Sequence, residues 1–148
     1  MIVDYELAKG LSKLGFHCKG FWIYIDGERT HTGLDGFDER EFNFIKDNYL
    51  DPTIAEDYEK ILYNKQLSND AYPQKKPEIL CAPEMEDVMI WMETFGLFIS
   101  YNQSSKNSIQ IIVNGQNFSS QKTYNNRIEG LRDAIAIGIE RLERQLNK

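Results

Sequence analysis

The sequence predicts an α+β protein with an N-terminal helix plus hairpin, an irregular helical middle, and a C-terminal αβββα unit with an antiparallel sheet. Apolar residues recur at helical spacing at both ends of the chain, whereas they alternate with polar residues along 108–111. The pairs Asp26-Gly27 and Asn114-Gly115 each follow a β-rich segment, and such pairs favour two-residue hairpin turns. These observations together indicate separated helical and antiparallel elements.

The N-terminal part is predicted from its caps and its turn. Asp4 is placed to cap a helix that Gly15 ends, and the apolar positions between them have helical spacing. Residues 20–25 are rich in β-branched and aromatic side chains, which predicts a strand with a weaker partner after Glu28.

The middle of the chain, residues 31–80, has few apolar residues, and Gly, Asp, Asn and Pro interrupt them. We expect short helices separated by loops. One helix is predicted near Pro52, with either Asp51 as its cap or Thr53 and Glu56 as a capping box.

The C-terminal part is predicted as a helix that Gly96 ends, three strands, and a last helix over 126–146. With Asn114-Gly115 as the turn, Val113 would face Gln116 and Ile111 would face Phe118. Ile109 would face Ser120 in the same register.

Two isoleucines break the apolar patterns of their helices. The core stripe of the last helix is predicted to consist of Ile128, Leu131, Ile135, Ile139, Leu142 and Leu146. Ile137 would then point away, and Ile90 likewise lies off the Met-rich stripe of the preceding helix. Single exposed isoleucines are common, so each is either an ordinary surface residue or a candidate binding residue. For Ile137 we hypothesise a contact surface for a second copy of the chain or a protein target. The small residues Gly130, Ala134 and Gly138 share one strip, for packing inside the chain or for a symmetric dimer.

The length of 148 residues predicts a single domain over 1–148, with possible sub-units 1–66 and 82–148 joined by a connector at 67–81. No apolar run is long enough for a membrane span, and no secretory signal is visible at the start. We therefore expect a soluble protein of the cytoplasm.

Charge argues against a nucleic-acid partner, because the net charge is −6 and the basic residues do not cluster. The αβββα order also occurs in double-stranded-RNA-binding domains, but residues 84–148 hold seven basic and eight acidic side chains. The acidic stretch 31–59 is either a solvated surface or a mimic of nucleic acid.

The sequence contains no catalytic or cofactor motif. The two histidines, His17 and His31, both lie near the first strand, where Asp26, Glu28, Asp35 and Asp38 are read as turn residues rather than as catalytic or metal-binding acids. Cys18 and Cys81 are expected to be free buried thiols, although a single bridge between them is the alternative. We therefore expect no enzyme activity, no metal and no cofactor.

Amide and hydroxyl side chains dominate the predicted sheet. Between Ser100 and Asn126, sixteen of 27 residues are Ser, Asn or Gln, and only Lys106 and Lys122 carry charge. Alternation places a neutral polar face on one side of the sheet, which is either an exposed surface or a binding face. Its candidate binding residues are Gln110, Ile112, Asn117 and Ser119.

Three segments resemble a loose family of small uncharacterised phage and prophage proteins of gut bacteria: YELAKGLSKLGF, CAPEMEDVMIWMETFGLFIS and NNRIEGLRDAIAIGIERL. They cover about a third of the chain, and no residue roles come with the resemblance. It implies a mobile-element accessory protein. With the residues above, it predicts a non-catalytic protein that binds a host or phage protein; a small-ligand or nucleotide-binding protein, and an RNA-binding module, are the alternatives.

Overall fold

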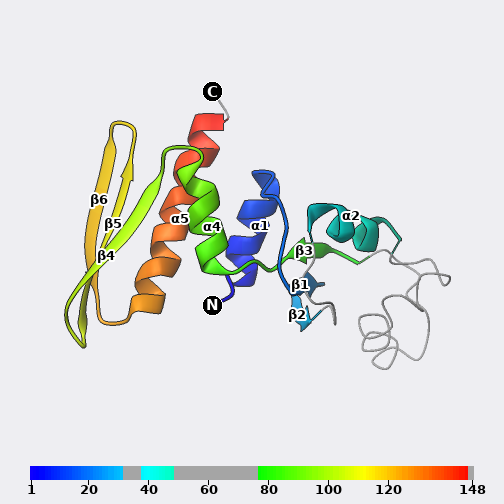
Figure 1. Cartoon of the computed structure of the whole chain (residues 1–148), viewed down its shortest axis with the longest axis horizontal. Coiled ribbons are helices and arrows are strands. Elements are labelled where there is room, and N and C mark those ends of the chain that lie inside the picture. Colours follow the sequence, from blue (N-terminus) through cyan, green and yellow to red (C-terminus); the bar gives the residue numbers. More distant parts are fainter. Residues whose placement is uncertain (32–37, 49–76, 147–148) are drawn as a thin grey trace. The chain divides into compact units, whose positions relative to one another are not determined.

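The computed structural model describes residues 1–31, 38–48 and 77–146, in which four helices and two three-stranded antiparallel sheets confirm the α+β class (Figure 1). The chain divides into two compact units. Unit 1 comprises Met1–Phe16 and Glu84–Lys148, and unit 2 comprises His17–Pro83. These bounds differ from the sub-units 1–66 and 82–148, because the first helix belongs with the C-terminal elements. The single domain over 1–148 stays a prediction.

The two shorter helices of unit 1 begin and end with local signals. In α1 (Tyr5–Lys13), the Asp4 carboxylate accepts a hydrogen bond of 2.9 Å from the Leu7 amide, and Gly15 follows the helix with φ of 79°. Helix α4 (Met85–Glu93) is followed by Gly96 at φ of 80°, and it buries Met85, Val88 and Met92. Both predicted glycine stops are therefore confirmed.

The sheet of unit 1 consists of β4 (Phe98–Ser105), β5 (Ser108–Gly115) and β6 (Phe118–Tyr124), in that order. The predicted register was wrong. Val113 pairs with Ser120, and Gly115 itself pairs with Phe118, so the turn lies two residues later, at Gln116-Asn117. Asn117 is therefore a turn residue rather than part of a strand face.

Packing explains why Asn114-Gly115 is not the turn. Gly115 is not in the left-handed region; instead, a Cβ there would lie 2.6 Å from Cδ2 of Leu97, so the position needs glycine for a close approach. The left-handed residue of the turn is Asn117, with φ of 60°. The turn moved by two residues, which shifts the partner of each β5 residue by four positions. Because four is an even number, every strand residue kept its predicted face.

Helix α5 (Arg127–Leu146) begins where the Ile128 amide donates a hydrogen bond of 2.7 Å to the Asn126 side chain. One side of α5 packs on the sheet. A Cβ at Gly130 would lie 2.6 Å from Cγ1 of Ile111, and Ala134 is buried in one cluster with residues of β5. Small side chains thus bring the helix backbone close to the strands.

A second side of α5, which includes Gly138 and Ile139, packs on the other helices of unit 1. A Cβ at Gly138 would lie 2.6 Å from Sδ of Met92 on α4, and a Cβ at Gly10 on α1 would lie 3.0 Å from Cγ2 of Ile139. Helix α5 therefore forms a middle layer between the sheet and the two shorter helices (Figure 1). The predicted small-residue strip serves packing inside this chain.

The core stripe predicted for α5 was correct in its middle, where Ile135, Ile139 and Leu142 are buried, and wrong in its extent. Ile137 does not point away, since it is partly buried against the cluster of Ile109, Ile111, Val113 and Ala134. Ile128, predicted to lie in the core, is 41% exposed, and Leu146 is exposed as well. A helix that packs on two sides buries more of its circumference than a single apolar stripe covers. The buried glycines of α5 add to this surface, although glycine does not count as apolar in the sequence pattern.

Unit 2 contains the hairpin of β1 (Trp22–Ile25) and β2 (Glu28–His31), with β3 (Ile79–Cys81) on the other side of β1. Asp26 and Gly27 both have positive φ, as the predicted turn requires. Helix α2 (Glu39–Asn48) belongs to the same unit. The last three residues of the predicted connector 67–81 form β3, and the predicted helix near Pro52 lies outside the described residues.

A disulfide joins Cys18 and Cys81, whose Cα atoms are 5.5 Å apart, so the expectation of free thiols was wrong. Pairing of β1 with β3 places Cys81 opposite Ile23 and thereby brings the end of β3 to the start of the unit. The linked cysteines are 63 positions apart, and both are buried. The bridge therefore fastens unit 2 close to its two chain ends.

Tyr124 links the end of β6 to α5. Burial raises the pKa of its hydroxyl, and the Asp133 carboxylate on α5 raises that pKa further through a hydrogen bond and its charge. The folded state thus favours the protonated phenol. This contribution is complete below the ordinary tyrosine pKa and is lost as pH rises through the raised value.

We predict that Asp133→Asn lowers the pKa of Tyr124, because the substitution removes the adjacent negative charge. The measurement is a pH titration of tyrosinate absorbance, with Tyr124→Phe as the control that identifies this residue among the eight tyrosines. An unchanged Tyr124 titration in Asp133→Asn would contradict the stated effect of the carboxylate.

We predict that reduction of the disulfide destabilises unit 2 by up to about 4 kcal/mol, the loop-entropy estimate for a closed loop of this length. A Trp91→Phe background leaves Trp22 on β1 as the fluorescent reporter of unit 2. Dithiothreitol should lower the urea midpoint in this background. Dithiothreitol should have no effect when Cys18→Ala and Cys81→Ala are added. Equal midpoints with and without reductant in the Trp91→Phe protein that retains both cysteines would show the bridge to be dispensable.

Candidate functional site

The outer face of the unit 1 sheet is the side away from α5 (Figure 1). Because Ile109, Ile111 and Val113 are buried against α5, the alternate residues of each strand point outward. The strand register brings these outward residues together in three rows. The outer face consists of Phe98, Ser100, Asn102, Gln110, Ile112, Asn114, Ser119, Gln121 and Thr123.

No residue of the outer face carries charge, although 27% of the chain is charged. Its amides and hydroxyls partly bond to one another. The Ser119 hydroxyl donates to Asn114 at 2.8 Å, and the Gln110 amide donates to Gln121 at 3.4 Å. Half-buried Ile112 lies at the centre of the nine, and Phe98 at one corner is 52% exposed. The face can therefore offer hydrogen bonds together with two apolar contact points.

The structure brings together only part of the predicted binding set. Gln110, Ile112 and Ser119 lie on the outer face as predicted. Asn117 lies in the β5–β6 turn, Ile137 packs under the sheet, and Ile90 is 58% exposed on α4. The outer-face residues that sequence reasoning missed are Phe98, Ser100 and Asn102 on β4, Asn114 on β5 and Thr123 on β6. Asn114 was assigned to the turn, and the predicted face was taken from the two strands on either side of that turn.

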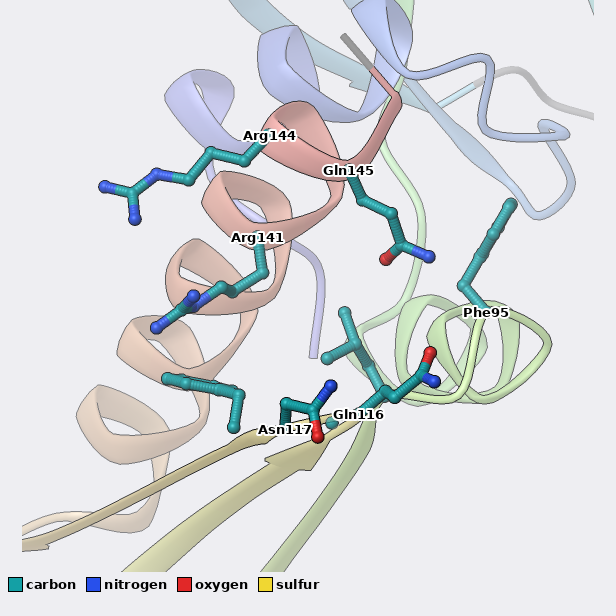
Figure 2. Close-up of a pocket in the computed structure, with 9 residues that line it drawn as sticks. Phe95, Gln116, Asn117, Arg141, Arg144 and Gln145 are labelled. Carbon is teal, nitrogen blue, oxygen red and sulfur yellow. The ribbon is translucent and has the colours of Figure 1, made fainter. Parts of the chain in front are cut away.

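A pocket of about 440 Å³ lies beside the β5–β6 turn and the end of α5; we name it the turn pocket (Figure 2). Leu97, Gly115 and Phe118 supply apolar walls, and Phe95 stands across from Gln145. Gln116, Asn117 and Gln145 supply amides, and Arg141 and Arg144 supply positive charge. The arginines were not predicted as site residues, although their spacing places both on one side of α5.

The two arginines of the turn pocket differ in their partners. Arg144 donates a hydrogen bond of 2.6 Å to the Glu140 carboxylate one helical turn earlier. Arg141 instead places its guanidinium carbon 3.8 Å from the centre of the Phe118 ring. Among the described residues, no carboxylate is paired with Arg141, so within this part of the chain no acidic side chain occupies its N–H donors.

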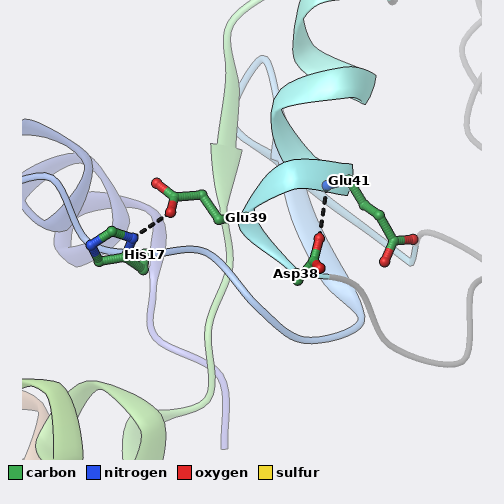
Figure 3. Close-up of polar contacts among 4 residues, drawn as sticks. All are labelled: His17, Asp38, Glu39 and Glu41. Atoms are coloured by element: carbon green, nitrogen blue, oxygen red, sulfur yellow. Dashed lines mark hydrogen bonds and ion pairs between the residues drawn. The ribbon is translucent and has the colours of Figure 1, made fainter.

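Two of the acidic residues near the first hairpin accept hydrogen bonds from backbone amides. Asp26 accepts a hydrogen bond of 2.9 Å from the Glu78 amide, and Asp38 accepts one of the same length from the Glu41 amide at the start of α2 (Figure 3). His17 contacts the Glu39 carboxylate through Nδ1. Within 1–31, 38–48 and 77–146, no three metal-binding side chains gather at one point. Asp35 lies outside these ranges.

No family model, curated protein or solved structure matches this chain. Among the helices in the described part of the chain, none has the length and apolar character needed to cross a membrane. The outer face and the turn pocket are therefore the two features that bear on function.

We predict that Ile137→Glu destabilises unit 1 by at least about 2 kcal/mol, because it places a charge against the apolar side of the sheet. Ile90→Glu is the matched control: this exposed isoleucine should tolerate the same substitution within about 0.5 kcal/mol. Urea unfolding followed by circular dichroism compares the two. Equal costs would mean that Ile137 is not packed as described.

Proposed function

We propose that this chain is a non-catalytic binding protein and that its target is another protein, held on the outer face of the sheet. The observation that carries the proposal is the absence of charge from all nine residues of that face. Water-exposed strands at sheet edges usually carry charged residues that prevent unwanted pairing. Depletion of charge is instead typical of the centre of a protein interface.

The composition of the outer face favours a protein over a nucleic acid. A phosphate backbone is bound mainly by Lys and Arg, and the nine residues include neither. Amides can bond to the backbone or polar side chains of a partner, while Ile112 and Phe98 contribute apolar area. Strands β4 and β6 also form the two edges of this sheet in the part of the chain described, so a partner strand has an edge to join.

The setting of this function is also a proposal. The resemblance to phage and prophage proteins supports an accessory role in which the partner is a host or phage protein. A cytoplasmic location rests on the sequence alone. The disulfide between Cys18 and Cys81 argues against a cytoplasmic location, because disulfides persist mainly in oxidising compartments.

We predict that Gln121→Lys, which places a charge beside Ile112 in the middle row of the outer face, abolishes capture of the partner without unfolding the protein. The parent and the variant are used as baits in the same host lysate, and captured proteins are quantified by mass spectrometry. A protein that the parent enriches should fall at least about tenfold with the variant, because an unpaired charge buried in an interface is costly.

Ile90→Lys provides the control, since it adds the same charge to an exposed site on α4. It should retain the partner. If Ile90→Lys loses the partner and Gln121→Lys keeps it, the binding surface is on α4 and the assignment of binding to the outer face is wrong. If neither variant changes the captured proteins, the outer face is an ordinary solvated surface.

A further inference from the structure

We propose that the turn pocket is a second binding site, distinct from the outer face, and that its ligand is a nucleotide. A nucleotide combines a phosphate anion with a planar base, and each of these parts has a matching wall in the pocket. The pocket lies at the end of α5, and none of the nine residues of the outer face lines it. The site therefore goes beyond the proposed protein-binding function.

Arg141 provides the anion contact. Its guanidinium carbon lies 3.8 Å from the centre of the Phe118 ring, and this cation–π contact favours the orientation seen before a ligand arrives. A guanidinium fork matches phosphate oxygens in pairs, and such charge-assisted bonds are roughly twice as strong as neutral ones. None of the residues that line the pocket is acidic, and the Glu140 carboxylate is bound to Arg144.

The remaining walls fit a planar base. Gln116, Asn117 and Gln145 place three amide groups around the pocket, and amides can pair with the donors and acceptors on a base edge (Figure 2). Phe95 and Leu97 supply apolar surface, of which Phe95 is partly exposed and open to stacking. The volume of about 440 Å³ lies within the range of small-molecule sites, roughly 300 to 1,000 Å³.

The experiment is isothermal titration calorimetry on the full chain with adenosine monophosphate, adenosine and inorganic phosphate. Adenosine monophosphate should bind with Kd below about 1 mM, and about tenfold or more tightly than either adenosine or phosphate alone. Adenosine tests the need for the anion, and phosphate tests the need for the base.

Three variants locate the binding. Arg141→Gln should weaken nucleotide binding about tenfold or more by removing the charge. Gln145→Glu should also weaken it, because it adds a negative charge to a pocket wall, and it leaves the contact between Arg141 and Phe118 intact. Arg127→Gln is the matched control, since Arg127 also stacks on an aromatic ring of the sheet, Tyr101, but does not line the pocket.

Any of four results would overturn the proposal. These are no nucleotide binding below about 1 mM, adenosine or phosphate binding within about threefold of the nucleotide, an equal loss in Arg127→Gln, or no loss in either pocket variant. Melting temperatures of the variants are measured alongside, so that a loss caused by unfolding of Arg141→Gln is recognised and Gln145→Glu then decides.

Discussion

Helix α5 packs on two sides, and the rest of unit 1 depends on how closely its neighbours approach it. Gly130 allows Ile111 to reach the helix backbone from the sheet, and Gly138 allows Met92 to reach it from α4. A larger side chain at either position would have to displace a buried neighbour. This close packing positions the sheet so that one side is covered and the other, the outer face, remains available.

Local signals in the sequence were sufficient where one residue decides the geometry. Asp4 and Asn126 cap their helices, and Asp26-Gly27 turns the first hairpin, because each interaction is made within a few residues. Contacts between residues that are far apart in the chain could not be predicted in the same way. Gly115 resembles a turn residue in sequence, yet it is needed for contact with Leu97, eighteen positions earlier in the chain.

The candidate sites show the same difference. Gln110, Ile112 and Ser119 were assigned to the correct face despite the wrong register, because strand alternation has a period of two. Ile137 was misplaced because periodicity gives the centre of one stripe, whereas α5 has packing partners on two sides. The turn pocket was missed entirely, since it joins Phe95 to Arg141 across a turn whose position only the folded register defines.

The disulfide also changes what a single break in the chain would do. Cys18 and Cys81 lie just inside the bounds of unit 2, so nearly all of that unit is contained in the covalent ring they close. If a protease hydrolysed one peptide bond between these two positions, the fragments would stay joined as one molecule under oxidising conditions. Unit 1 would then retain both of its segments, Met1–Phe16 and Glu84–Lys148, on a common covalent scaffold.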